Sequence, residues 1–541
     1  MRRSFHERLS ALDQTFLAFE TQNAGMHVAI TAIFESGSLI APGGGVDVGR
    51  IRRRIGARLR LIPRYRQRLA HTPLMNEPIW VDDQAFDLEY HVRRIRLPRP
   101  GGERQLQRRC AEILERPLDR RRPLWETWII EGLSGGRFAM LAKVHHCMVD
   151  GIAGVDILAA ILDTAPGDAE EPIEPWLPRP VPSERELFAD EVRRRARASL
   201  GLVRGVRDAL RAPWQAGRTV GERASAFARL LGNLRRAPST PFNQPIGAHR
   251  RIAWLTFDLA TIKAVRTRLG GTINDVVLTT VSGAVGKFLA RRGVRLDGAF
   301  RTVVPVSMRA PDEHGVPGNR VSLWLTELPV DEPSAERRLE TVSAMTAQLK
   351  ANNEASGAEV LMQAAEWTTA NLINLAAQFI NRTRCFNLIV TNVPGPPVPF
   401  YLLGARMVAG YPHLPLFENQ GLGVALFSYA GQLYWGVGAD WNQMPDLADF
   451  MDDLATSFQD LCQAADVTAP AAMTRPAVPA PPLTLHRGAA LTPSAAAAVA
   501  RGTGVRRRVA SAVGGLRRVT PAPRVDRVRF SRSTARPTGR H

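Results

Sequence analysis

Residues 137–151 read RFAMLAKVHHCMVDG, and this stretch combines a clear structural pattern with a group of reactive side chains. Every second position of its first half is apolar: Phe138, Met140, Ala142 and Val144. Because successive side chains of a β-strand point to opposite faces, the alternation predicts a strand that leads directly into His145 and His146. For the same reason, only one of the two histidines can face a given cavity.

The histidine pair, followed by Asp150 and Gly151, forms the pattern HHxxxDG. A neutral imidazole has a pKa of about 6.5 and can accept a proton from a hydroxyl near neutral pH. Such a base needs a fixed tautomer, which a carboxylate or a backbone carbonyl can provide. Asp150 could orient the ring directly, or it could pair with an arginine and hold the loop; the sequence leaves both open. Gly151 indicates a tight backbone at the end of the motif.

Other chemistry fits the sequence less well. A metal site would need a third ligand, and the sequence has no HExxH or comparable cluster, so we expect no metal. Cys147 has no basic neighbourhood beyond the motif, which favours a small buried residue over a nucleophile. The sequence lacks a GxSxG elbow, which argues against a serine hydrolase. Its four cysteines are widely spaced, which is typical of a reducing cytoplasm rather than of a disulfide framework.

Strand-like and helix-like segments interleave on both sides of the motif, which predicts an α/β fold. In the first 180 residues, we expect strands at 26–34, 124–130 and 137–144 and helices at 48–61 and 152–162. Beyond residue 250, we expect helices at 274–290 and 333–351 and strands at 301–306, 387–391, 423–429 and 432–437. Ala430 and Gly431 separate the last two strands and predict a hairpin turn.

The same patterns divide the chain into four parts. Residues 1–180 and 251–465 each predict an α/β domain, residues 181–250 a basic helical linker, and residues 466–541 a disordered tail rich in Arg, Ala and Pro. Within the linker, apolar residues recur every three or four positions from Val192 to Leu210, with arginines between them. Such a helix can lie on an anionic interface, or it can pack on its own protein with its basic face in solvent.

The charge of the chain is unevenly distributed. The chain has 541 residues, which is more than one ordinary domain needs. Its formal net charge is +20. The tail contains 14 Arg against two Asp, so most of the positive charge lies outside the predicted domains. Its only aromatic residue is Phe530, so we expect no specific nucleic-acid partner. No run of about 18 apolar residues predicts a membrane span, and the N-terminus lacks the apolar core of a signal peptide.

Further motifs follow along the chain in a fixed order: Leu9–Leu17 (LSALDQTFL), Met26–Val28 (MHV), Pro123–Trp125 (PLW), Pro241–Gly247 (PFNQPIG) with Arg250 and Arg251, Thr272–Leu278 (TINDVVL), Val304–Arg309 (VPVSMR), Gly318–Asn319, and Thr391–Pro396 (TNVPGP). Together with HHxxxDG, this ordered set resembles the wax ester synthase/diacylglycerol acyltransferase family of bacteria over roughly residues 9–460. HHxxxDG alone is shared with peptide-synthetase condensation domains, so the ordered set is the more specific signal.

The resemblance implies two chloramphenicol-acetyltransferase-like domains with the active site in a channel between them. It implies that His146 is the general base, that His145 belongs to the catalytic set, and that Asp150 is mainly structural. Asn274 would orient the substrate or support the oxyanion. The residues implied to shape the channel or the domain interface are Pro123, Leu124, Trp125, Gly151 and Asp275.

The implied activity is transfer of a long acyl group from acyl-CoA to diacylglycerol, or to a long-chain alcohol, without a cofactor. One alternative is a condensation-type or polyketide-associated transferase that takes its acyl group from a carrier protein; the PLW and ND motifs argue against it. Another is a non-enzymatic lipid-surface protein, which would have no need of an intact HHxxxDG. We expect the protein in the cytoplasm, attached peripherally to membrane or lipid droplets through its amphipathic segment and basic tail.

Overall fold

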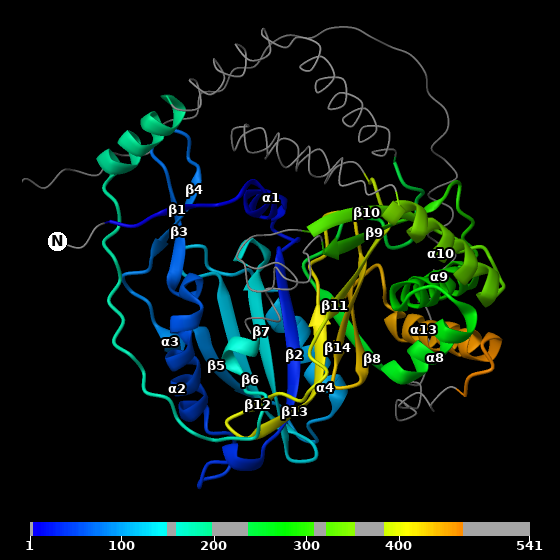
Figure 1. Ribbon diagram of the computed structural model, residues 1–541, viewed down its shortest axis with the longest axis horizontal. Helices are drawn as coiled ribbons and strands as arrows, with labels where there is room; N and C mark the ends of the chain where they lie inside the picture. The colour runs from blue at the N-terminus through cyan, green and yellow to red at the C-terminus, as the bar shows by residue number, and fades with distance from the viewer. Residues whose placement is uncertain (1–3, 149–157, 197–235, 308–320, 352–383, 469–541) are drawn as a thin grey trace, which may run out of the picture. The chain divides into compact units, whose positions relative to one another are not determined.

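The computed structural model describes residues 4–148, 158–196, 236–307, 321–351 and 384–468. These residues form two α/β lobes, each built on a six-stranded sheet (Figure 1). Several expectations lie outside the described residues: Asp150, Gly151, residues 152–157 of an expected helix, residues 197–210 of the amphipathic segment, the Gly318–Asn319 motif and the tail from residue 469.

The N-terminal lobe contains the predicted histidine strand near the middle of its large sheet, whose order is β12-β13-β2-β7-β6-β5. Its strands are β1 (Glu7–Arg8), β2 (His27–Glu35), β3 (Gln67–His71), β4 (Pro78–Asp82), β5 (Val92–Arg96), β6 (Trp125–Leu133) and β7 (Arg137–His145). Its helices are α1 (Ala11–Phe19), α2 (Val48–Arg58), α3 (Leu88–His91) and α4 (Glu103–Leu114), with 3₁₀ turns η1 (Gly37–Leu39), η2 (Leu59–Leu61), η3 (Pro63–Arg66) and η4 (His146–Met148). Strands β1, β4 and β3 form a separate small sheet.

The C-terminal lobe has a sheet of order β10-β9-β11-β14-β15-β8, and four helices of its described residues are grouped beside this sheet (Figure 1). Its strands are β8 (Arg250–Asp258), β9 (Phe300–Ser307), β10 (Val321–Leu328), β11 (Leu388–Pro394), β14 (Leu422–Tyr429) and β15 (Gln432–Asp440). The helices are α8 (Leu259–Leu269), α9 (Ile273–Arg291), α10 (Ala335–Ala351) and α13 (Leu447–Ala464). The predicted hairpin between β14 and β15 is confirmed: φ is 46° at Ala430 and 81° at Gly431, as a type I′ turn requires.

Two strands from the second half of the sequence belong to the sheet of the N-terminal lobe. Strands β12 (Tyr401–Leu402) and β13 (Ala405–His413) lie within the range expected for the second domain, yet they extend the first sheet, where β13 pairs antiparallel with β2. Strand β15 of the other sheet passes close to β13: a Cβ at Gly436 would lie 1.7 Å from the carbonyl oxygen of Pro412. Glycine at position 436 therefore permits the close approach of the two sheets.

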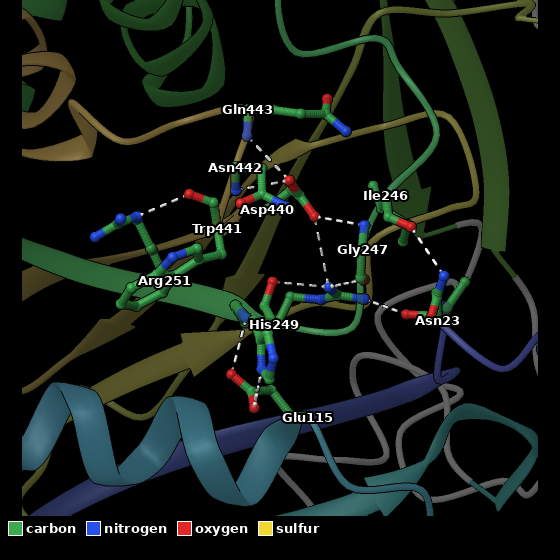
Figure 2. A network of polar contacts seen from close by, with 12 residues as sticks. Asn23, Glu115, Ile246, Gly247, His249, Arg251, Asp440, Trp441, Asn442 and Gln443 are labelled. Carbon is green, nitrogen blue, oxygen red and sulfur yellow. Dashed lines mark hydrogen bonds and ion pairs between the residues drawn. The ribbon is translucent and has the colours of Figure 1, made fainter. Parts of the chain in front are cut away.

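A polar cluster at the end of α4 also joins the lobes (Figure 2). The Glu115 carboxylate accepts the backbone N–H of Arg250 at 2.9 Å and lies 3.1 Å from Nδ1 of His249. From the loop before β2, the side-chain amide of Asn23 donates to the carbonyl of Ile246 at 3.1 Å. These contacts fix the start of β8 against the N-terminal lobe.

An acidic stretch near the end of the first predicted domain, residues 163–171, is held on helix α2. Arg54 is only 4% exposed and forms ion pairs with Asp163 and with Glu171, the latter at 2.9 Å. Neighbouring Arg53, which is half exposed, pairs with Glu170 at 3.2 Å. Buried ion pairs of this kind are costly to break, because the partners are left without compensation in a poorly solvated place.

We therefore expect Arg54→Ala to lower the free energy of unfolding by about 2 kcal/mol, since two charge-assisted contacts are lost in a buried position. The matched control is Arg53→Ala, which removes an exposed pair on the same helix and should cost under about 1 kcal/mol. Urea unfolding of both variants checks this, and equal losses in the two would contradict the assignment.

Candidate active site

The histidine pair lies where the central strand β7 ends. Strands β2 and β6 flank β7, and the backbone N–H of His145 donates to Leu124 at 2.9 Å. One residue later, the N–H of His146 donates to the carbonyl of Met26 at 2.8 Å, and the chain then turns into η4. Hydrogen bonds from both neighbouring strand ends thus fix the backbone of the pair.

The His146 ring is half-buried under helix α1. Phe16 of this helix stacks on it, with ring centroids 3.8 Å apart and an interplanar angle of 15°. Aromatic stacking of this kind limits rotation of the imidazole. The imidazole of His146 therefore has a defined orientation and lies partly exposed at the margin of the N-terminal lobe.

His145 faces different surroundings, as strand alternation predicts. It is 1% exposed, and its Nδ1 accepts the backbone N–H of Cys147 at 3.1 Å. Its Nε2 lies 3.7 Å from Oε1 of Glu20. Since Nδ1 is an acceptor, the proton of the neutral ring must be on Nε2. His145 is thus buried in its own lobe, with Nδ1 hydrogen-bonded to the turn and Nε2 facing the Glu20 carboxylate.

Glu20, at the C-terminal end of α1, is held as a carboxylate. Burial alone would raise its pKa, but the neighbouring His145 and Arg120 side chains outweigh that effect and lower the pKa to about 2. Arg120 Nε donates to Oε2 of Glu20 at 2.9 Å. The carboxylate therefore keeps its charge at neutral pH.

A buried lysine lies two residues before His145, on the same face of β7. Lys143 is 1% exposed and donates to the carbonyls of Ile113, at 3.0 Å, and Arg116. On β2, Nε2 of His27 contacts the carbonyl of Leu114 at 3.0 Å. These side chains satisfy carbonyls at the C-terminus of α4, which has no further helical turn to pair with them. Burial lowers the pKa of Lys143 to about 8, although Glu126 and Glu20 act to raise it.

Cys147 is not equipped as a nucleophile. It is 3% exposed in a small apolar cluster, and burial raises the pKa of its thiol well above the usual range. The prediction that it is a small buried residue is confirmed. Within the described ranges, no group of three His, Cys, Asp or Glu side chains could hold a metal ion.

The PLW residues lie inside the N-terminal lobe. Leu124 and Trp125 are buried, and the Trp125 indole donates to the carbonyl of Tyr65 at 2.8 Å while His91 stacks on it with centroids 4.5 Å apart. Because Leu124 also accepts the N–H of His145, this segment supports the histidine strand directly. A role of Pro123, Leu124 and Trp125 in lining a channel stays a prediction.

Asn274 and Asp275 lie in the other lobe, at the start of α9. Asn274 is half-buried in the first turn of the helix. Asp275 is buried and caps the helix: its carboxylate accepts the N–H of Thr272 at 2.8 Å and the hydroxyl of Thr346, on α10, at 2.7 Å. The structure therefore gives Asp275 a structural part, while the role of Asn274 stays a prediction.

Sequence reasoning missed Phe16 and Glu20 as neighbours of the histidines. Both are in or next to the LSALDQTFL segment, and their spacing of four residues places them on one side of a helix. That spacing was the available signal. It does not reveal which surface the helix covers, because docking of α1 on η4 depends on tertiary contacts.

Solved structures share this architecture. The wax ester synthase/diacylglycerol acyltransferase of Marinobacter aquaeolei VT8 superposes with a TM-score of 0.61 at 25% identity, covering 85% of this chain and 100% of that one. The first condensation domain of the calcium-dependent antibiotic synthetase has a TM-score of 0.55 at 16% identity, covering 86% and 98%, which shows the fold alone. Fold and histidine turn together define an acyltransferase of the two-domain, chloramphenicol-acetyltransferase-like class.

The sequence comparisons are more specific. Residues 9–277 match the wax ester synthase/diacylglycerol acyltransferase catalytic domain, and residues 317–462 match the WS/DGAT C-terminal domain. A Mycobacterium tuberculosis protein named as a diacylglycerol O-acyltransferase is 34% identical over 476 residues, covering 85% of this chain and 91% of the relative. Another from the same species, similarly named, is 33% identical over 448 residues, covering 81% and 92%. The chain belongs to the wax ester synthase/diacylglycerol acyltransferase family.

The buried lysine predicts how stability depends on pH. Its folded pKa of about 8 lies below the ordinary value of about 10.4, so between these values the unfolded chain binds more protons than the folded one. The free energy of unfolding should therefore rise with pH across this window. Lys143→Met should remove about 2 kcal/mol of that rise between pH 7.5 and pH 10, measured by urea unfolding. Lys287→Met, which removes a surface ion pair with Asp460, should leave it in place. Identical pH dependence in wild type and Lys143→Met would contradict the assignment.

Proposed function

We propose that this protein transfers a long acyl group from acyl-CoA to the hydroxyl of diacylglycerol, and also to long-chain alcohols, with His146 as the general base. The observation that carries the proposal is the difference in burial and contacts between the two histidine rings. His145 is sealed in the lobe, where its Nδ1 accepts the Cys147 N–H and its Nε2 faces Glu20, whereas His146 is half-buried and stacked on Phe16. Family membership and the names of the relatives support the substrates.

In this mechanism, His146 takes the proton of the acceptor hydroxyl as its oxygen attacks the thioester carbonyl carbon. Negative charge then develops on the carbonyl oxygen, where an amide donor such as Asn274 would stabilise it by about 3 kcal/mol. When the intermediate collapses, the carbon–sulfur bond breaks and the imidazolium returns its proton to the thiolate of CoA. The products are an ester and free CoA, and no acyl-enzyme is needed.

The same geometry could serve a carrier-protein thioester, as in condensation-type transferases. Likeness to condensation domains at 16% identity supports the shared fold only. The relatives above 30% identity are named as diacylglycerol O-acyltransferases, which favours acyl-CoA as the donor. An assay without any carrier protein separates the two donors.

The base is tested with His146→Ala, assayed with long-chain acyl-CoA and diacylglycerol. We expect kcat to fall by about 10²–10⁴-fold, the usual contribution of a positioned acid–base group, with the urea midpoint little changed. His71→Ala, an exposed histidine on β3, is the matched control and should keep full activity. Near-normal turnover by His146→Ala would show that another group is the base.

Peripheral attachment to membrane or lipid droplets is part of this proposal. None of the helices in the described part of the chain has the length and hydropathy to span a bilayer. Residues 184–196 are helical, and this helix exposes Phe188 and Val192 one turn apart with the exposed Arg193 beside them. Exposed apolar side chains flanked by arginines are typical of helices that bind the interface of anionic lipid.

We therefore expect Phe188→Ser/Val192→Ser to lower the fraction of protein that sediments with anionic phospholipid vesicles severalfold, because apolar contact with the lipid is lost. Leu323→Ser removes an equally exposed apolar side chain from edge strand β10 and serves as the control. Unchanged sedimentation of the double variant would exclude this helix as an anchor.

A further inference from the structure

The proposed base is held by a turn whose geometry depends on a neighbouring ring. In η4, the N–H of Cys147 is satisfied by Nδ1 of His145 rather than by a backbone carbonyl. This hydrogen bond joins the residues on either side of His146. It exists only while Nδ1 of His145 is unprotonated, because two N–H groups cannot bond to each other.

The charge that faces the opposite nitrogen belongs to Glu20. Its Oε1 is 3.7 Å from Nε2 of His145, and its side chain is 11% exposed. Its other oxygen, Oε2, faces Arg120. A carboxylate in this position favours a proton on Nε2 and disfavours the opposite tautomer, since the attraction acts in a poorly solvated place.

Helix α1 couples the two histidines as well. Phe16 stacks on His146, and Glu20, one helical turn later, faces His145. The same short helix thus contacts both rings, and Arg120 also donates to the carbonyl of Leu17 at 3.1 Å, which holds the end of α1 in place. A change in Glu20 would be transmitted to η4 by the tautomer and by the helix.

We infer that Glu20 is a positioning residue for the acyl transfer: its carboxylate keeps the proton of His145 on Nε2, so that Nδ1 can accept the Cys147 N–H and hold His146 in its working orientation. The inference rests on the proposed function of His146. It assigns no contact between Glu20 and the substrate. Its effect should therefore appear in kcat, with little change in KM for acyl-CoA.

The test compares three leucine variants. Glu20→Leu removes the carboxylate at nearly constant volume and should lower kcat by about 10–100-fold, with KM within about twofold of wild type. Arg120→Leu breaks the ion pair with Glu20 and loosens the end of α1 but leaves the carboxylate beside His145, so it should lose clearly less of kcat than Glu20→Leu. Glu112→Leu breaks ion pairs with Arg108 and Arg109 on α4 and should leave kcat unchanged. Equal loss in Glu20→Leu and Arg120→Leu, or a kcat within twofold of wild type in Glu20→Leu, would overturn the inference.

A second readout does not depend on activity. Nitrogen NMR of protein labelled at histidine reports the ring tautomer, and the His145 signals are assigned by their loss in His145→Gln. The wild type should show His145 with its proton on Nε2, and Glu20→Leu should lose this preference. A wild-type His145 protonated on Nδ1 would refute the inference. Retained activity of His146→Ala would instead refute the proposed base and leave the tautomer result standing.

Discussion

The end of strand β7 is the point on which the site depends. A β-strand in the middle of a sheet has both of its edges hydrogen-bonded, so its last residues can be fixed as rigidly as its first. Here the flanking segments contribute a carbonyl each, from Leu124 and Met26, to the two histidines. The backbone then leaves the sheet in a single turn. Adjacent imidazoles consequently meet different environments, one sealed inside the lobe and one at its margin.

The sealed face is unusually polar for the interior of a sheet. Lys143, His145 and His27 share it, next to the C-terminus of α4, whose carbonyls accept from Lys143 and His27. A cation at a helix C-terminus is favourable, and this offsets part of the cost of burying it. Glu115, the next residue of the chain after α4, contacts the start of β8. The polar layer below the histidines is thus continuous, through one helix end, with the joint between the lobes.

Local patterns were enough to predict the α/β class, most strands and helices, and the opposite surroundings of His145 and His146. The alternation of apolar residues in strands and their periodicity in helices depend only on nearby positions in the sequence, so they can be recognised without knowledge of the tertiary structure. The pairing of β13 with β2 was missed because the two strands are far apart in the sequence. In addition, Gly410 and Pro412 are residues that sequence patterns do not favour inside a strand. Glu20 was missed for a related reason: its role follows from where α1 docks, which no local pattern encodes.

Strand β13 also constrains how the two lobes can move. Strand β2 pairs with the histidine strand β7 along one edge and with β13 along the other, while Gly436 of β15 lies directly against β13. Pulling the lobes apart would break ladder hydrogen bonds between β13 and β2, each worth about 1 kcal/mol net, and expose the apolar surface packed behind them. We therefore expect substrates to reach the proposed base, His146, by local movements around a joined pair of sheets rather than by separation of the lobes.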